Sequence, residues 1–333
     1  MSTITPTEEA SPWHAGEQAL QRQAGVSERM EEVGRRVLRD HLIDQHRAFY
    51  PQLPFIVLAT VDGKGDAWAT LRANEPGFLQ SPDPFTLNVR LSRQAEDPAD
   101  AGMDDGDAIG MLGIELHTRR RNRLNGTIRR AGPASFEVDV GQSYGNCPKY
   151  IQLRDFSFVR DPSAGPAAEP AVLPALDSEA RRTIGAADTF FVATYAELEN
   201  GQRQADVSHR GGKPGFVRVG ADGVLTVPDF AGNLFFNTLG NILANGKAGL
   251  VFADFETGDL LQLTGDAEVV LDAPELDAFE GAERLWRFAP RRIIRRPDAL
   301  PLRWASHAES QSPSLRMTGS WDEAERRLSG SMA

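Results

Sequence analysis

Apolar and polar residues follow two different periods along the chain. Between residues 16 and 49, apolar side chains recur three and four positions apart, with charged residues between them. This period predicts a helical segment, with Ser27 as its expected N-cap and Pro51 and Pro54 as its expected end. Residues 1–15 are small and polar, and we expect them to fray.

After residue 54 the period becomes that of β-strands. In the first half of the chain the predicted strands span residues 55–61, 67–71, 85–91, 109–116, 124–128 and 136–140. Residues 62–65, of sequence DGKG, form the expected turn between the first two. The acidic and polar stretch 92–107 is predicted to be a solvated loop.

The second half shows a similar pattern. We expect a short helix at 178–185, capped by Asp177 or Ser178, and a longer one at 234–244. The predicted strands span residues 190–195, 205–208, 216–219, 224–227, 249–255, 260–271 and 284–288.

The two halves align with each other in order and spacing. Residues 55–60 (FIVLAT) match 190–194 (FFVAT), and 75–78 (EPGF) match 213–216 (KPGF). In this alignment Thr70 stands at the place of Ser208. Any two β-rich domains share an apolar pattern, but a Pro-Gly-Phe at the same point in both favours duplication. The chain is therefore expected to be mainly β, with one antiparallel barrel of about six strands and a central helix occurring twice.

A Pro/Ala-rich stretch gives the clearest boundary in the chain. We predict an N-terminal tail and helix at 1–48, a first barrel domain at 49–160, a linker at 161–175 and a second barrel domain at 176–333.

Composition narrows the class of protein. Of the 333 residues 41% are hydrophobic and 25% charged, and the net charge is −11. These values predict a soluble, cytoplasmic protein with no nucleic-acid or membrane partner. The one cysteine, Cys147, forms no intrachain disulfide; it is either a reactive thiol beside Lys149 or a small buried apolar residue. The six histidines, His307 among them, lack ligand spacing, so no metal site is expected.

The segment 206–216 (DVSHRGGKPGF) carries the first candidate chemistry. Its glycines leave backbone N–H groups exposed beside cationic, titratable and hydroxyl side chains, and this combination suits a phosphate. The candidate side chains are Ser208, His209, Arg210 and Lys213. The alternative interpretation is an ordinary glycine-rich turn with solvated charges.

A second candidate is the loop that leads into the predicted helix at 234–244. Helix N-termini offer free N–H groups to an anion, and Phe230 or Phe236 would stack on a planar ring. Phe235 is assigned to the core instead. The candidate ligand contacts of this segment are Asp229, Phe230, Asn233 and Asn237.

Three runs together give a resemblance to a known family: SHRGGKPGFVRV, PDFAGNLFFNTLGNILANGKAGLVFADF and GDLLQLTGDAEV. They resemble the pyridoxamine 5′-phosphate oxidase-related proteins, which have the FMN-binding split-barrel fold. The resemblance is stronger over 188–270 than over 49–155. It implies tandem split barrels that form an internal pseudo-dimer, with FMN bound non-covalently in the cleft between them.

The resemblance also assigns residues. Lys213 falls at the family's phosphate-binding lysine, whereas Ser208 stands where an arginine is expected, so the oxidase's own substrate is not implied. Gln262 and Arg123 occupy the position of an arginine that points at the flavin, and Arg119 lies in the same basic run. Arg121 and Arg129 are as well explained as solvated strand-edge residues. Tyr144, Asn146 and Lys149 are further candidates for polar groups of the cleft.

The implied activity is a flavin-dependent oxidoreductase acting on an unidentified small molecule, with NAD(P)H or another electron donor as partner and a homodimer as a further possibility. No catalytic residue is assigned, and FAD or another flavin is the alternative cofactor. The alternative functions are a non-catalytic flavin or haem binder, and an enzyme that uses FAD or a deazaflavin as substrate.

Overall fold

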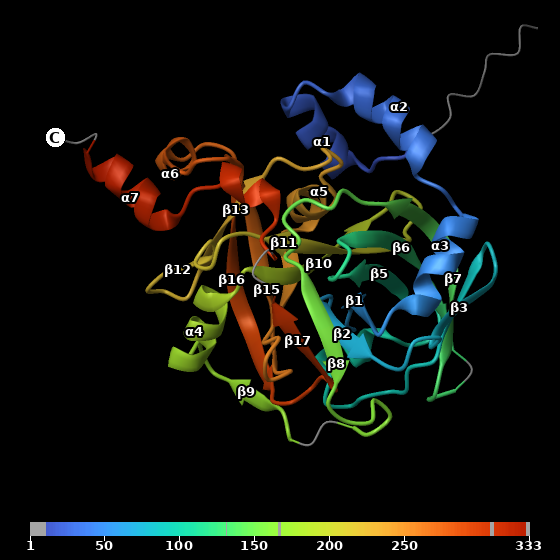
Figure 1. The fold of residues 1–333 in the computed structure, drawn as a ribbon. Helices are drawn as coiled ribbons and strands as arrows, with labels where there is room; N and C mark the ends of the chain where they lie inside the picture. Colours follow the sequence, from blue (N-terminus) through green and yellow to red (C-terminus); the bar gives the residue numbers. More distant parts are fainter. Residues whose placement is uncertain (1–10, 131, 166–167, 307–309, 331–333) are drawn as a thin grey trace, which may run out of the picture.

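Two antiparallel sheets make up most of the molecule (Figure 1). The computed structural model describes residues 11–130, 132–165, 168–306 and 310–330. The placement of His307 and of residues 1–10 lies outside these ranges. The predicted fraying of residues 1–15 is wrong for the described part 11–15, because Trp13 is buried and a helix begins at Ala15. Within the described part, the chain is mainly β, as the period-two pattern predicts.

The first sheet has the strand order β2-β1-β5-β6-β7-β4-β3. Its strands are β1 (Phe55–Val61), β2 (Ala67–Ala73), β3 (Leu79–Asp83), β4 (Thr86–Val89), β5 (Ala108–Glu115), β6 (Arg120–Arg129) and β7 (Phe136–Gly145).

The second sheet has the strand order β11-β10-β14-β15-β16-β13-β12. Its strands are β10 (Thr189–Glu197), β11 (Arg203–Gly211), β12 (Arg218–Val219), β13 (Leu225–Phe230), β14 (Lys247–Ala253), β15 (Leu260–Val270) and β16 (Ala282–Arg296). If the strands of each sheet are numbered from one in chain order, both sheets have the same strand order, 2-1-5-6-7-4-3.

The strand registers agree residue by residue as well. In the first sheet Ala59 lies opposite Gly110, and in the second Ala193 lies opposite Gly249. Both glycines face the other half: a Cβ on Gly110 would lie 2.7 Å from the Ala205 carbonyl oxygen, and one on Gly249 would lie 2.2 Å from that of Ala67. The two halves thus contact each other reciprocally, each through a glycine of one strand against a backbone carbonyl of the other half.

Each half has a core of its own, and a third cluster joins them. Side chains on one face of the strands form these cores. The first-half core includes Ile56, Leu58 and Met111, and the second-half core includes Phe190 and Trp286. The joining cluster combines residues of both sheets, namely Phe55, Val57, Leu71, Phe191, Val207 and Val251. The apolar residues on both faces of β1 and β10 are thus explained by burial on both sides.

The N-terminal helical region consists of three short helices rather than one. They are α1 (Ala15–Gln23), α2 (Ser27–Val37) and α3 (Asp44–Phe49), followed by η1 (Tyr50–Gln52). Ser27 is the first residue of α2, and Val26 occupies the cap position, so the predicted N-cap is wrong by one residue. Helix α1 packs closely on α5 (Asn237–Asn245), because a Cβ on Gly16 would lie 2.1 Å from the Gly240 carbonyl oxygen.

The acidic stretch 92–107 differs from its prediction as a solvated loop. It contains the short helix η2 (Pro98–Gly102), and the side chains of Asp97 and Asp100 are buried. Ion pairs with Arg72 explain this burial, since both carboxylates lie within 3.6 Å of its guanidinium. A composition rule does not detect a partner so far away in the sequence.

The predicted linker also holds regular structure. Residues Ala171–Leu173 form β9, which pairs with β16, and α4 (Ser178–Ala186) follows with Asp177 as its N-cap. Strand β8 (Arg154–Phe158) precedes the linker but pairs with β17 (Leu302–Ser306) near the C-terminus. The remaining elements are α6 (Pro274–Ala278), η3 (Pro313–Met317) and α7 (Trp321–Gly330).

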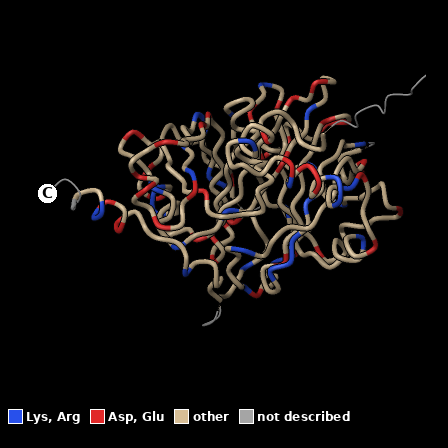
Figure 2. Tube along the Cα trace, turned by 90° about the horizontal axis from the view of Figure 1, so that it is seen from above, with Lys and Arg blue, Asp and Glu red and all other residues tan. Residues whose placement is uncertain are grey.

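Charges are mixed over the molecule. Figure 2 shows basic residues interspersed with acidic ones along the trace. No helix in the described part of the chain is long and apolar enough to span a bilayer.

Candidate functional site

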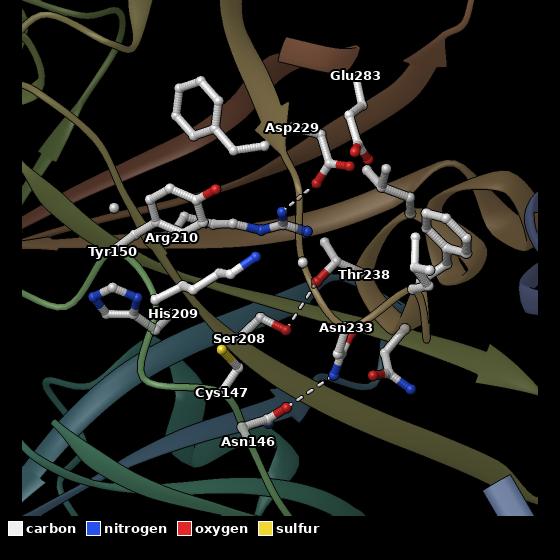
Figure 3. Close-up of a pocket in the computed structure, with 18 of the residues that line it drawn as sticks. Asn146, Cys147, Tyr150, Ser208, His209, Arg210, Asp229, Asn233, Thr238 and Glu283 are labelled. Carbon is white, nitrogen blue, oxygen red and sulfur yellow. Dashed lines mark hydrogen bonds and ion pairs between the residues drawn. The ribbon is translucent and has the colours of Figure 1, made fainter. Parts of the chain in front are cut away.

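A pocket of about 120 Å³ lies where the two halves meet. The second half contributes the end of β11, the end of β13 and the loop from residue 231 to the start of α5. The first half contributes β6 and the segment 146–150 that follows β7. Figure 3 shows side chains from both halves pointing toward the same space.

Most of the predicted site residues come together here. The pocket is lined by Arg123, Ser208, His209, Arg210, Asp229, Phe230, Asn233 and Asn237. Of the additional cleft candidates, Asn146 and Lys149 line it, whereas Tyr144 is buried beneath it.

Three predicted residues lie elsewhere. Lys213 donates a hydrogen bond to the Thr318 carbonyl, and Arg119 donates to the Ile151 carbonyl at 2.9 Å. Gln262 is fully buried on the other side of the interface between the halves, where it donates to the Ala69 carbonyl at 3.0 Å. Each side chain donates to a backbone carbonyl that is distant in the sequence, and alignment to a family does not show such a contact.

Two cations of the pocket already have carboxylate partners. Arg123 pairs with Asp206 at 3.3 Å, and Arg210 pairs with Asp229 at 2.5 Å. Arg123 also donates to the hydroxyl of Ser208. These pairs hold the two guanidinium groups in place and balance their charge.

The other two cations differ. Arg121 donates through Nε to the Cys147 carbonyl at 2.8 Å, and Lys149 donates to the Ala231 carbonyl at 3.3 Å. Within the described ranges neither has a carboxylate partner. Burial, followed by repulsion from Arg123, lowers the pKa of Arg121 to about 10, which leaves it charged at neutral pH. The two carboxylates that line the pocket, Asp229 and Glu283, pair with Arg210 and Arg284. Among the described residues, Arg121 and Lys149 therefore have no carboxylate within ion-pair distance.

Sequence reasoning assigned Arg121 equally to a solvated strand edge, and the structure separates it from Arg129. Arg129 is exposed and pairs with Glu137 and Asp139 across the sheet. Arg121 lies two residues before Arg123 on the same strand, and side chains two apart share a face of a strand. That period was the signal available for placing it in the pocket.

Hydroxyl and amide groups line the floor and one wall. The Thr238 hydroxyl donates to the Ser208 hydroxyl at 2.9 Å, and the Asn233 amide donates to Asn146 across the two halves at 3.0 Å. The Asn233 side-chain oxygen also accepts from the Phe235 N–H, so it fixes the loop before α5. Figure 3 marks the first two contacts.

Aromatic side chains form another wall. The rings of Tyr150 and Phe230 lie 5.5 Å apart, and the Arg284 guanidinium lies 4.5 Å from the Phe236 ring centre. Tyr150, Leu234 and Phe236 all have positive φ, at 64°, 66° and 64°. Residues with a Cβ rarely adopt this conformation, and such strain concentrates at functional sites. Phe235, by contrast, packs in the core against Trp13 and Tyr144, as predicted.

Beneath the pocket lies a buried polar network. The Tyr144 hydroxyl accepts from Arg123 and donates to the Asn237 side-chain oxygen at 3.1 Å, and the Asn237 amide donates to Glu17 of α1 at 2.6 Å. Burial, and then repulsion from Asp206, raise the pKa of Glu17 to about 8. Among the described residues, none hydrogen-bonds to Nε2 of His209, and burial lowers the pKa of this side chain, so its ring is neutral at pH 7.

Comparisons with known proteins leave the family open. No family model and no curated protein matches the chain. Three solved structures resemble parts of it: HupZ of Group A Streptococcus (TM-score 0.29, 18% identity, 35% of this chain and 91% of that one), a protein provisionally named as a pyridoxamine 5′-phosphate oxidase from Lactobacillus delbrueckii (0.26, 15%, 32% and 95%), and MrkH of K. pneumonia in complex with c-di-GMP (0.24, 12%, 77% and 87%). At these TM-scores, none of the likenesses establishes a fold family or a function for this chain.

Proposed function

We propose that the pocket binds FMN through its phosphate, and that the chain is a flavin-dependent oxidoreductase built from two split barrels of common origin. One observation supports this most directly. Arg121 and Lys149 point uncompensated positive charge into a pocket between the two halves, beside aromatic rings. Both side chains are partly buried, and a partly desolvated cation without a carboxylate partner is stabilised when an anion binds beside it.

The phosphate end of FMN fits the residues present. Arg121 and Lys149 supply charge, the Ser208 and Thr238 hydroxyls supply hydrogen bonds, and the first N–H groups of α5 have no partner within the helix. Residues Asn237 and Thr238, at the start of that helix, line the same pocket. A phosphate is the group that such a set recognises.

The pocket is too small to enclose the isoalloxazine ring of FMN as well as the phosphate. The pocket volume of about 120 Å³ is smaller than the roughly 300–1,000 Å³ of sites that enclose a whole organic ligand. We therefore assign only the phosphate contacts to the pocket itself. We propose that the isoalloxazine ring lies at the opening of the pocket, beside Tyr150, Phe230 and Phe236. Aromatic side chains favour offset contact with a planar ring.

The role of the protein is to bind and to orient. Bound flavin would supply hydride or electron transfer, with NAD(P)H as the proposed donor. Arg121 and Lys149 hold the phosphate, and the Asn146–Asn233 contact keeps the two walls of the pocket together. His209, neutral at pH 7, adds no charge to the site. No described residue is assigned a proton-transfer step.

The test compares FMN with riboflavin, which lacks the phosphate. Quenching of flavin fluorescence gives both dissociation constants for the wild type and for Arg121→Gln. A hydrogen bond to a charged group contributes roughly 1.5–3 kcal/mol, so the wild type should bind FMN at least about tenfold more tightly than riboflavin. Arg121→Gln should lose most of that preference.

The matched control is Arg129→Gln, on the same strand but exposed and paired outside the pocket. It should bind FMN as the wild type does. Equal affinity of the wild type for FMN and riboflavin would exclude the phosphate assignment. Anaerobic mixing of the flavin-loaded protein with NADH or NADPH then separates an oxidoreductase, whose flavin bleaches, from a protein that only binds.

A further inference from the structure

The strand registers identify a counterpart of the pocket in the other half. Leu58 pairs with Thr70 and with Met111, just as Val192 pairs with Ser208 and with Leu250. Thr70 therefore corresponds to Ser208, and Arg72, two residues further along β2, corresponds to Arg210. On the neighbouring strand of the opposite half, Gln262 corresponds in the same way to Arg123.

This counterpart is filled by the chain itself. The carboxylate of Asp97, in the segment before η2, accepts from the Thr70 hydroxyl at 2.6 Å and from the Gln262 amide at 3.0 Å. Its oxygens also lie 3.5 Å from Arg72 and 3.1 Å from Arg296. Asp97 is only 2% exposed, so solvent does not compete for these contacts.

We propose that Asp97 is an internal ligand, which permanently occupies the first-half counterpart of the pocket and leaves the chain with one exchangeable anion site. A carboxylate held by a hydroxyl, an amide and two guanidinium groups has the contacts that a bound anion makes. The inference extends the proposed function by stating which half takes the ligand. It predicts that removal of this carboxylate creates a second site, for a small carboxylate from solution.

The electrostatics of the cluster support this interpretation. Burial alone would raise the pKa of Asp97, but Arg296 and Arg72 outweigh it and lower the pKa below its ordinary value. The buried guanidinium groups thus require a negative charge at this position. In the open pocket, no described carboxylate accepts from the Ser208 hydroxyl, which contacts the Arg123 guanidinium and, at 2.9 Å, the Thr238 hydroxyl. Arg210, the counterpart of Arg72, pairs with Asp229 instead.

The first test substitutes Asp97→Ala, which removes one carboxylate group and leaves space for formate. In chloride buffer the variant should melt well below the wild type, because two buried guanidinium groups lose their main partner. In about 0.3 M sodium formate, its melting temperature should rise by about 3 °C or more relative to sodium chloride of equal ionic strength.

Two controls exclude a general salt effect. The wild type should show no such difference between formate and chloride, since its own carboxylate occupies the site. Asp139→Ala removes a carboxylate from Arg129, whose exposed side chain is solvated, and it should respond equally to both salts. If Asp97→Ala melts at the same temperature in both salts, or stays unfolded in both, the proposal is wrong.

The reciprocal test places a carboxylate in the open pocket. Thr238→Asp puts it beside Ser208 and Arg123, in the first turn of α5, where a negative charge is favourable. FMN affinity should fall at least about tenfold, whereas the neutral Thr238→Asn should bind within about threefold of the wild type.

Unchanged FMN affinity in Thr238→Asp would contradict the correspondence between the two sites. If the wild type itself does not bind FMN, the proposed function fails instead, and the formate experiment alone decides whether Asp97 is an internal ligand. The two failures are therefore distinguishable.

Discussion

The buried carboxyl of Glu17 makes the stability of this protein depend on pH in a direction opposite to that of most carboxylates. Glu17 is 2% exposed, and its ordinary pKa of 4.5 rises to about 8, first through burial and then through the nearby charge of Asp206. Its folded state therefore holds a proton that the unfolded state releases between pH 4.5 and pH 8. Stability should fall as the pH rises through this range, by about 1.4 kcal/mol per unit and about 5 kcal/mol in all.

Urea unfolding of the wild type and of Glu17→Gln between pH 5.5 and pH 8.5 tests this reasoning. Glutamine keeps an oxygen for the Asn237 amide but does not titrate. The difference in unfolding free energy between the two proteins should shift in favour of the variant by about 1.4 kcal/mol per pH unit up to pH 8.

Other titrating groups cancel in that difference to first order. His14 also faces this carboxyl, and burial lowers its pKa, so its own effect is a gain of stability as the pH rises toward 6.5. Glu31→Gln, on the outer part of α2, should follow the wild-type curve. Parallel curves for the wild type and Glu17→Gln would refute the assignment of a raised pKa to Glu17.

Two further predictions concern the interface and the pocket. Gly249→Ala should lose roughly 1–3 kcal/mol in urea unfolding, because its Cβ would lie 2.2 Å from the backbone oxygen of Ala67, whereas Gly63→Ala, with open space around it, should be nearly neutral. An unaffected Gly249→Ala would show that the halves can separate at this contact. Cys147 lines the pocket, so saturating FMN should slow its alkylation by iodoacetamide several-fold, while riboflavin, which lacks the phosphate, should protect it less; equal rates with and without FMN would place the ligand elsewhere.

Local pattern was enough to predict most strands, and long-range pairing explains where it failed. The predictions of strands at 55–61, a run of apolar and β-branched residues, and at 260–271 are confirmed by β1 and β15. The prediction of solvated charge at 92–107 fails because Asp97 meets Arg296, nearly two hundred residues away. Neither period nor composition contains that contact.

The location of the candidate site could also be predicted only in part from the sequence. Three residues of the motif at 206–216, Ser208, His209 and Arg210, lie at the end of β11 and line the pocket. Their role as ligand contacts stays a prediction. Lys213 does not follow them, because the chain turns after Gly211 and its side chain bonds to the Thr318 carbonyl. Lys149, which the sequence offered as a further cleft candidate, comes from the other half and lines the pocket.

The distribution of ion pairs is the strongest support for the proposal that the pocket binds an anion. Acidic residues outnumber basic ones by 47 to 36, so partners for cations are plentiful. The nearly fully buried guanidinium groups of Arg72, Arg154 and Arg296 each lie within 3.5 Å of a carboxylate. Arg121 and Lys149 have no such partner among the described residues, although a single carboxylate nearby would stabilise them. Asp97 bridges the hydroxyl, amide and guanidinium groups of one site, whereas in its counterpart Asp206 pairs with Arg123 and Asp229 pairs with Arg210. Arg121 and Lys149 are the groups that we propose an anion from solution satisfies.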